Sequence, residues 1–439
     1  MYDAYLDDLL HVDSYGCIFM YATHKDLTTA PRHIIRMTEP VDPRVLLAAV
    51  RQALERYPQF ALGLTRGDTK YAYRLLTKPP VVLPMEDISP YYIGSDDTNG
   101  YLFLCGYKES TIYLEYQHCT SDGRGFDAFI RTILFYYLRG MGHDVVNDGS
   151  IRTKETAFTP SDCEDGYLRL RGMPQSDAEH HEDVPAFHMP EYDSSSDEDE
   201  LTTELTLSLP KVLHYTKENG VTPMTFLMTA LSMGMYRTYY EGTDRKEPII
   251  AEIPMDLRAY VKTTTTRFFV SLLDLPFFYD YFSLPFLEAC QACKAYFDTQ
   301  RHLPHAVYWA LKNANRVASS HKSDMPIDEK EQMMRQQARD YIRRDSFILT
   351  NIGAFKVPPE MEALIDDYSA ILPCAFQPFG VLVSSYKDVL KVSLSQRDFN
   401  YKLVENVRAV LREIGFETDA MPYTYHVTRY DGMHLAKDE

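Results

Sequence analysis

The stretch Thr111-Ile-Tyr-Leu-Glu-Tyr-Gln-His-Cys-Thr-Ser-Asp-Gly-Arg-Gly-Phe126 joins an expected strand to an expected helix. Its apolar residues alternate at Ile112, Leu114 and Tyr116, which is typical of a strand with one buried face. From Phe126 onward, apolar residues recur at i, i+3, i+4, i+7, i+8 and i+11, which places them on one face of a helix. A strand that enters a helix through a polar, glycine-containing turn indicates an α/β fold. We expect functional side chains at that turn.

The same order of elements, a hairpin followed by a helix, occurs twice in the chain. The first hairpin is expected from residues 101–105 and 111–118, and its helix covers 126–137. The second is expected from residues 379–384 and 389–394, and its helix covers 403–414 and ends at Gly415. Two more helices, over 42–57 and 222–239, begin with an N-cap residue followed by proline. The sequence therefore predicts two α/β (α+β) lobes of related topology, with mixed sheets flanked by helices.

The composition narrows the class of protein. In 439 residues, 45% are hydrophobic and 25% are charged, as in ordinary globular chains, and no apolar run reaches the length of a membrane span. The N-terminus is acidic, unlike a signal peptide, so we expect a cytoplasmic protein. A net charge of -18 argues against a nucleic-acid partner, because phosphate contacts need clustered Lys and Arg. Seven scattered cysteines fit reduced thiols better than a disulfide framework.

The acidic charge is concentrated in one segment. Residues 176–204 contain eleven Asp and Glu residues and no Lys or Arg. Such a stretch cannot bury enough apolar surface to offset the entropy of ordering it. We therefore expect an N-terminal lobe over 1–160, an acidic linker or mobile loop over 161–204, and a C-terminal lobe over 205–439. An acidic partner or a metal-binding tract is the alternative for this segment.

The turn after the first hairpin permits two interpretations. Gly123, Gly125 and Ala128 match the G-x-G-x-x-A fingerprint of a dinucleotide-binding turn. That fingerprint needs a second parallel strand ending in an acid about 20 residues later, and the segment 140–149 offers none. The second interpretation takes His118 and Asp122 as a unit, H-x-x-x-D-G. His118 is in phase with the apolar face of the strand, so it should be desolvated and neutral, as a general base requires, although a structural histidine also fits.

The sequence gives weaker support for three other kinds of site. Cys290 and Cys293 have the spacing of zinc ligands, but no second pair follows them, and we expect no metal site. Cys119 is adjacent to His118, but neighbours on a strand point to opposite faces, which argues against a Cys-His dyad. The chain has no G-x-S-x-G elbow, which disfavours a serine hydrolase.

The H-x-x-x-D-G stretch resembles the active-site signature of the superfamily of condensation domains and CoA-dependent acyltransferases, whose fold is like that of chloramphenicol acetyltransferase. Four further stretches support the resemblance, in the right order along the chain. They are 41–60, with Val41-Asp-Pro and Arg56-Tyr-Pro-Gln-Phe60; 253–270, with Pro254-Met-Asp-Leu-Arg258 and Phe268-Phe269; Phe347-Ile-Leu-Thr-Asn-Ile-Gly353; and Pro378-Phe-Gly380. Within the superfamily, the chain looks most similar to stand-alone alcohol O-acetyltransferase-like proteins.

The resemblance implies a fold, a reaction and a set of residues. Donor thioester and acceptor would meet in a tunnel between the lobes, where His118 would deprotonate a hydroxyl or amine. The implied catalytic set is His118, Asp122 and Gly123. Within it, Asp122 would form a structural ion pair with Arg258, and the Gly123 N–H would lie near the oxyanion. The matching substrate-binding positions are Phe269, Thr350, Asn351, Phe379 and Gly380. Acyl-CoA would be a co-substrate, with no permanently bound cofactor, and we expect a monomer.

Two departures and one alternative stand beside this hypothesis. Gln117 occupies a position where many relatives have histidine, and the loop at 378–380 lacks the Asp and Trp of a D-F-G-W motif. The second departure favours transfer from a free thioester over condensation on a carrier protein. The alternative function is a catalytically idle member of the superfamily that binds a ligand or acts as a scaffold.

Overall fold

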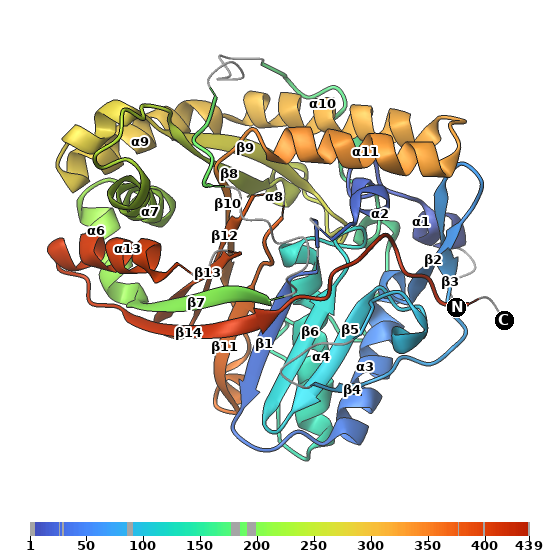
Figure 1. Ribbon diagram of the computed structural model, residues 1–439. Coiled ribbons are helices and arrows are strands. Elements are labelled where there is room, and N and C mark those ends of the chain that lie inside the picture. Colours follow the sequence, from blue (N-terminus) through green and yellow to red (C-terminus); the bar gives the residue numbers. More distant parts are fainter. Residues whose placement is uncertain are drawn as a thin grey trace.

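Two β-sheets form the centre of the protein (Figure 1). The structure, a computed structural model, describes residues 5–25, 27–28, 30–85, 91–176, 185–190, 199–375, 377–397 and 400–437. The five-stranded sheet has the order β11 (Ile365–Ile371), β1 (Arg32–Met37), β6 (Thr111–Tyr116), β5 (Phe103–Lys108), β4 (Leu83–Pro84). The seven-stranded sheet has the order β14 (Asp419–His426), β7 (Asp199–Ser208), β13 (Val389–Gln396), β12 (Phe379–Tyr386), β10 (Phe347–Ala354), β8 (Ile249–Asp256), β9 (Val270–Phe277). A separate hairpin joins β2 (Leu62–Arg66) to β3 (Tyr71–Leu75).

The five-stranded sheet and two long helices make up the first lobe. These helices are α3 (Pro43–Arg56) and α4 (Gly123–Gly140), and they pack against each other. Their buried apolar residues share one core with those of β1, β5 and β6. Leu46, Val50 and Ala53 of α3 meet Phe129, Ile133 and other residues of α4 there, which explains the one-sided apolar pattern of both helices.

The seven-stranded sheet and its helices make up the second lobe. Four helices gather on one side of this sheet in Figure 1: α6 (Leu209–Glu218), α7 (Pro223–Tyr239), α9 (Phe286–Gln300) and α13 (Tyr401–Glu413). Strand β10 runs parallel to β8 and to β12, whereas the other pairs are antiparallel, so the sheet is mixed. Both lobes thus have the predicted architecture of mixed sheets flanked by helices.

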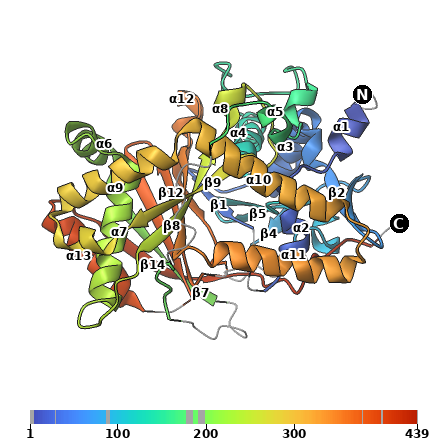
Figure 2. The ribbon, with the colours of Figure 1, turned by 90° about the horizontal axis from the view of Figure 1, so that it is seen from above.

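Two further long helices cross the top of the molecule (Figure 2). They are α10 (Leu303–Lys322) and α11 (Ile327–Ile342), and α11 packs against α2 (Ile18–Ala22) from the start of the chain. The remaining short helices are α1 (Leu6–Leu10), α5 (Tyr167–Leu170), α8 (Arg258–Val261) and α12 (Pro359–Glu362). The buried residues of α2 therefore form part of the hydrophobic core of the second lobe, called the second core below.

The predicted hairpins and helices are present, with small differences at their ends. Strands β5 and β6 form the first hairpin and strands β12 and β13 the second, followed by α4 and α13. The expected N-caps are also present, since Asp42 accepts from the Arg44 N–H and Thr222 accepts from the Thr225 N–H. Strand β6 ends at Tyr116, two residues before the predicted end, so His118 lies in the turn that follows.

The division of the chain at the acidic segment does not coincide with the division of the sheets. Strand β11 comes from the second half of the chain but pairs with β1 in the first lobe. Most of the acidic run, 177–184 and 191–198, lies outside the described residues. The rest of the expected linker contains a 3-10 turn (Pro160–Asp162), α5 and the first residues of β7. The domain boundaries themselves stay a prediction.

Two further features of the structure concern membrane-spanning helices and the cysteines. Across the described ranges, no helix has both the length and the apolar character needed to cross a bilayer. All seven cysteines are buried and free. Cys290 and Cys293 lie on α9, and nowhere in the described part of the chain do three metal-ligating side chains gather at one point.

Candidate active site

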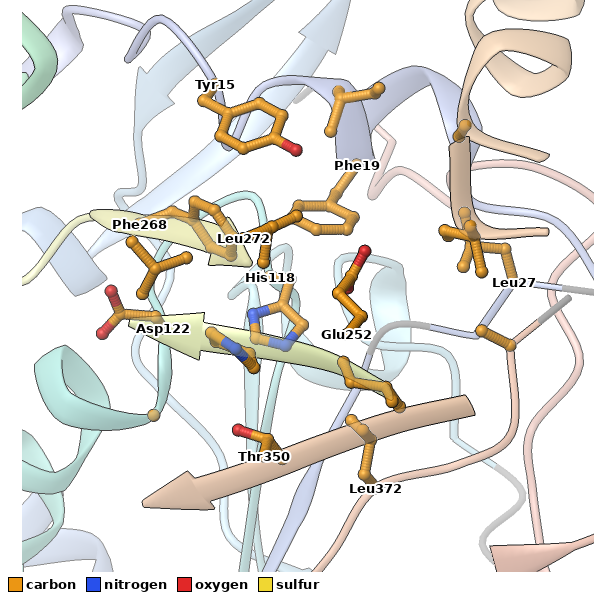
Figure 3. A pocket seen from close by; sticks show the side chains of 18 of the residues that line it. Tyr15, Phe19, Leu27, His118, Asp122, Glu252, Phe268, Leu272, Thr350 and Leu372 are labelled. Atoms are coloured by element: carbon orange, nitrogen blue, oxygen red, sulfur yellow. The ribbon is translucent and has the colours of Figure 1, made fainter. Parts of the chain in front are cut away.

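A cavity of about 230 Å³ lies between the two lobes. The turn between β6 and α4 contributes His118, Asp122, Gly123 and Arg124 from the first lobe, and β8, β9 and β10 contribute the opposite wall. Helices α2, α10 and α11 supply further lining residues. Figure 3 shows His118 near the middle of this cavity, with Phe19, Glu252 and Thr350 around it. The lining is mainly apolar, so the few polar side chains in it need an explanation.

The alternation of strand residues decides which side chains reach the cavity. On β8, Ile249, Ala251 and Ile253 belong to the core beneath the helices, whereas Glu252, Pro254 and Asp256 line the cavity. On β10, Phe347 and Leu349 belong to that core, whereas Ile348, Thr350 and Ile352 line the cavity. One face of the seven-stranded sheet therefore packs on helices and the other forms the wall of the cavity.

His118 is held in one orientation and one tautomer. Its Nδ1 lies 3.0 Å from the Ser121 carbonyl oxygen, which can only accept, so Nδ1 carries the hydrogen. The neutral ring therefore keeps Nε2 as its acceptor, and within the described part of the chain Nε2 has no hydrogen-bond partner. Phe19 stacks on the ring with centroids 5.1 Å apart, and Phe268 meets it edge-on at 5.7 Å. Burial lowers the pKa of His118, and the Ser121 carbonyl and the Asp122 carboxylate offset this only in part.

The Asp122 carboxylate connects the turn to the second lobe. One oxygen, Oδ1, accepts from the Gly125 N–H at 2.9 Å and so caps α4. The other, Oδ2, accepts from the Phe269 N–H at 2.8 Å. Arg258 Nη2 donates to both oxygens, at 2.9 and 2.8 Å. The structure thus brings the predicted pair Asp122 and Arg258 into contact, and it gives Asp122 no hydrogen bond to His118 among the described residues.

Two glycines let the turn fit between the lobes. A Cβ on Gly125 would overlap the backbone carbonyl oxygen of Thr266, and a Cβ on Gly123 would lie 2.8 Å from Ile352 Cγ2. Gly123 lines the cavity at the first turn of the 18-residue helix α4. The N–H groups of a helix's first turn lack helical partners and carry partial positive charge, which favours an anion there. The dinucleotide interpretation of these glycines is not supported, because it needs a strand parallel to β6 after the helix, and both neighbours of β6, β1 and β5, are antiparallel to it.

The remaining predicted residues divide into two groups. Thr350 and Asn351 line the cavity. Phe269, Phe379 and Gly380 do not, although all three were expected to bind substrate. Phe269 is fully buried against Gly166 and Tyr167, and it meets Asp122 only through its backbone. Phe379 packs on Phe347 in the second core, and the adjacent Phe268 lines the cavity in place of Phe269.

Much of the lining has no counterpart in the sequence prediction, and Tyr15, Phe19 and Glu252 are three such residues. Tyr15 and Phe19 come from the N-terminal segment, which shares no motif with the turn at His118. Glu252 precedes the expected P-x-x-L-R stretch and lines the cavity although its residue is 5% exposed. Burial and the nearby Asp274 raise the pKa of Glu252 to about 8, with Arg344 opposing them. A charged residue within an otherwise apolar strand, Ile249-Ile-Ala-Glu-Ile253, was the available signal.

Comparisons with known proteins show the fold. No protein-family model and no curated protein sequence matches the chain. Among solved structures, polyketide synthase associated protein 5 from Mycobacterium tuberculosis is 14% identical, with a TM-score of 0.62 over 92% of this chain and 97% of that protein. TRI101 from F. sporotrichioides, complexed with coenzyme A and T-2, is 12% identical, with a TM-score of 0.60 over 94% and 99%. The starter condensation domain of rhizomide synthetase RzmA is 12% identical, with a TM-score of 0.50 over 92% and 94%.

These similarities span almost the whole of each chain. The protein therefore shares the two-lobed fold of these structures, among them TRI101 and a condensation domain, and the expected fold is confirmed. Proteins with this fold include acetyltransferases and condensation domains.

Proposed function

We propose that the protein is an acyltransferase that moves an acyl group from an acyl-CoA-type thioester to a hydroxyl or amine acceptor. The observation that carries this proposal is the state of His118. The Ser121 carbonyl fixes the Nδ1 hydrogen, which leaves the Nε2 lone pair available in the cavity between the lobes. The lowered pKa keeps the imidazole neutral near pH 7, as a general base requires.

The proposed reaction follows from that geometry. Nε2 of His118 takes the proton of the acceptor hydroxyl while the hydroxyl oxygen attacks the thioester carbonyl carbon. The C=O bond opens to an oxyanion, which then reforms the carbonyl as the C–S bond breaks. The imidazolium returns its proton to the departing thiolate, so the products are an ester and a free thiol. An amine acceptor follows the same course and gives an amide.

Other residues of the cavity support individual steps. The Gly123 N–H at the start of α4 is suited to stabilise the oxyanion, a contribution of about 3 kcal/mol for a preorganised donor. Thr350, whose hydroxyl has no partner among the described residues, is a second candidate donor. Asp122 and Arg258 are positioning residues, because they form their hydrogen bonds with each other and with the backbone. Arg124 and Arg316 are exposed residues in the lining, where either could meet the phosphates of a CoA-type donor.

The test is thiol release from short- and long-chain acyl-CoAs in the presence and absence of alcohols and amines. We expect acceptor-dependent release and a product ester or amide detected by mass spectrometry. His118→Ala should lose the transfer, whereas His305→Ala, which removes a buried histidine outside the cavity lining, should retain it. Transfer that is equally fast in His118→Ala would contradict the proposal.

The alternative is a ligand-binding protein without catalysis. The mainly apolar cavity would serve such a protein equally well. Binding of an acyl-CoA or an alcohol with no turnover, under conditions where the folded protein is verified, would favour this alternative. Fold alone does not decide between the two, because one fold can carry more than one function.

A further inference from the structure

Glu252 is a buried carboxyl group in the wall of the cavity. Its residue is 5% exposed, and Oε2 makes no hydrogen bond to any described residue. Figure 3 shows the side chain extending from β8 into the cavity, on the side where Leu27 and Phe19 also lie. A buried polar atom without a partner costs free energy, and such a group is expected to be satisfied by something that the cavity receives.

The surroundings of Glu252 favour a neutral carboxyl group over a carboxylate. Asp274 lies directly opposite it on β9, and Asp274 already pairs with Arg344 at 3.2 Å. Asp345 is a second buried acid nearby, and neither of its oxygens has a partner among the described residues. Three acids thus share one adjacent guanidinium, and an additional negative charge would lie in an apolar cavity beside like charges.

A neutral carboxyl group both donates and accepts a hydrogen bond. A hydroxyl group has the same two capacities, so one hydroxyl can satisfy it on both sides. We propose that Glu252 recognises a second hydroxyl group on the acceptor, so that the ligand is a mainly apolar alcohol with one hydroxyl at His118 and another at Glu252. The inference rests on the proposed function only for the place of the reacting hydroxyl, because recognition at Glu252 requires no turnover.

The remainder of the cavity is consistent with such a ligand. Ile18, Phe19, Leu272, Ile348 and Leu372 line it and would contact a hydrocarbon body. Arg316 also lines it, but its guanidinium is exposed and its Cζ lies 5.6 Å from the centre of the Tyr341 ring. Arg316 therefore has contact with solvent, whereas Glu252 is 5% exposed and its Oε2 is shielded, so the cost of an unmet hydrogen bond falls on Glu252.

The experiment measures binding by isothermal titration calorimetry with the full chain at pH 7. The probes are alkane-α,ω-diols and 1-alkanols of the same chain lengths, and the quantity of interest is the ratio of the alkanol Kd to the diol Kd. At the best chain length, this ratio should be about tenfold larger for the wild type than for Glu252→Met, since one net hydrogen bond is at stake. Glu252→Gln, whose amide also donates and accepts, should keep most of the wild-type ratio.

Asp345→Asn is the matched control, because it removes a neighbouring buried acid that does not line the cavity. It should leave the ratio unchanged. Thermal unfolding checks that each variant folds, and Glu252→Met should be at least as stable as the wild type because an unpaired acid is removed.

Three results would overturn the inference. They are an equal ratio in the wild type and Glu252→Met, a ratio altered as much by Asp345→Asn as by Glu252→Met, and tighter binding of ω-amino-1-alkanols than of the diols, which would indicate a carboxylate that binds a cation. Failure of the proposed function is distinguishable. A protein that discriminates diols through Glu252 but transfers no acyl group supports this inference and contradicts acyl transfer.

Discussion

Arg258 Nη2 bridges both carboxylate oxygens of Asp122, at 2.9 Å from Oδ1 and 2.8 Å from Oδ2. The rest of the guanidinium is also engaged, since Nη1 donates to Asp256 and Nε donates to the Thr265 carbonyl. Because Asp122 starts α4 and Arg258 follows β8, this contact joins the turn of the first lobe to the sheet of the second. The catalytic histidine of the proposed reaction lies four residues before Asp122, so the ion pair fixes the position of the histidine relative to the cavity wall.

Asp122→Asn should therefore lower the free energy of unfolding more than it alters the chemical step itself. The variant removes the buried one of the two carboxylates that contact Arg258 and leaves the more exposed Asp256, and breaking a buried pair in this way costs on the order of 3 kcal/mol of unfolding free energy. Urea unfolding gives the value. The matched control is Glu115→Gln, which breaks the buried pair between Glu115 on β6 and Arg32 on the neighbouring strand β1, neither of which lines the cavity. Both variants should be destabilised, but only Asp122→Asn should weaken ligand binding in the cavity. An unchanged stability for Asp122→Asn would contradict the assigned role.

His118→Ala should reduce kcat by roughly 10²–10⁴ while the Kd for the thioester changes little, because a general base acts mainly in the transition state. In the wild type, kcat/KM should rise with pH as the imidazole loses its proton. Since burial lowers the pKa of His118, the midpoint of that rise should lie below the ordinary value of about 6.5. The measurement is a pH-rate profile with one acyl-CoA and one acceptor. A midpoint above 7 that disappears in His118→Ala would show that the histidine is stabilised in its charged form, contrary to its surroundings.

Cys119→Ser distinguishes the base mechanism from a thiol nucleophile. Cys119 is adjacent to His118 in sequence, but its side chain is fully buried in the second core and does not line the cavity. Burial raises the pKa of this thiol well above its usual range, so the reactive thiolate is suppressed. The variant should transfer acyl groups at close to the wild-type rate, and intact-mass spectrometry should detect no acylated cysteine in the wild type. Loss of transfer in a folded Cys119→Ser protein would point to covalent catalysis.

The local parts of this architecture are predictable from the sequence, and the reasons are visible in particular elements. The helices α3, α4, α7 and α13 carry N-cap residues, and α3, α4 and α13 also have one-sided apolar patterns; both signals depend only on neighbouring residues. The strand that ends near His118 and the turn through Asp122 were predictable for the same reason. The pairing of β11 with β1 was not, because β11 joins a sheet whose other strands lie more than 200 residues earlier.

The lining of the cavity was only partly predictable, because it depends on which face of each strand turns toward the first lobe. Thr350 follows from the parity of β10, but Phe268 and Phe269 precede β9 in an irregular segment where alternation does not apply. The Asp122 carboxylate fixes that segment through the Phe269 N–H, which leaves Phe268 facing the cavity. Glu252 could be flagged as an acid in an apolar strand, but only the packing of two lobes shows what it faces.

The glycines of the turn should differ in their tolerance of a methyl group. Gly125→Ala would place a Cβ against the Thr266 carbonyl oxygen, a backbone atom that cannot move without shifting the strand segment beside it. Gly123→Ala would meet the Cγ2 methyl group of Ile352 at 2.8 Å, which is a side-chain atom rather than a backbone atom. Overpacking of the first kind costs about 1–3 kcal/mol, and we expect a smaller loss for the second. Urea unfolding of the two variants checks the order. A Gly125→Ala protein as stable as the wild type would show that the lobes are less closely packed than the structure indicates.

Glu252 should make the stability of the wild type depend on pH. Its pKa is raised to about 8 by burial and by Asp274, against an ordinary value of 4.5 in an unfolded chain. The folded protein therefore holds this proton more tightly than the unfolded chain does, so the contribution is complete below pH 4.5 and is lost as the pH rises through 8. In Glu252→Gln the contribution is absent. The variant should thus gain stability relative to the wild type across this window, by at most about 1.4 kcal/mol for each pH unit.

The comparison isolates Glu252 because the other charged groups near it are unchanged. These are Asp274 on β9, Tyr341 on α11, Arg344 and Asp345 after α11, Arg316 on α10 and Tyr15 of the N-terminal segment. Burial also raises the pKa of Asp345, so the wild type and Glu252→Gln share a residual dependence in the same direction, and only their difference is diagnostic. Glu288→Gln, at an exposed position on α9, should follow the wild type at every pH, because an exposed carboxylate is solvated in both states. The contrary result is that the unfolding free energies of Glu252→Gln and the wild type run parallel from pH 5 to pH 8. Glu252 would then be ionised already in the folded protein. It could not offer the neutral carboxyl group on which recognition of a second hydroxyl depends.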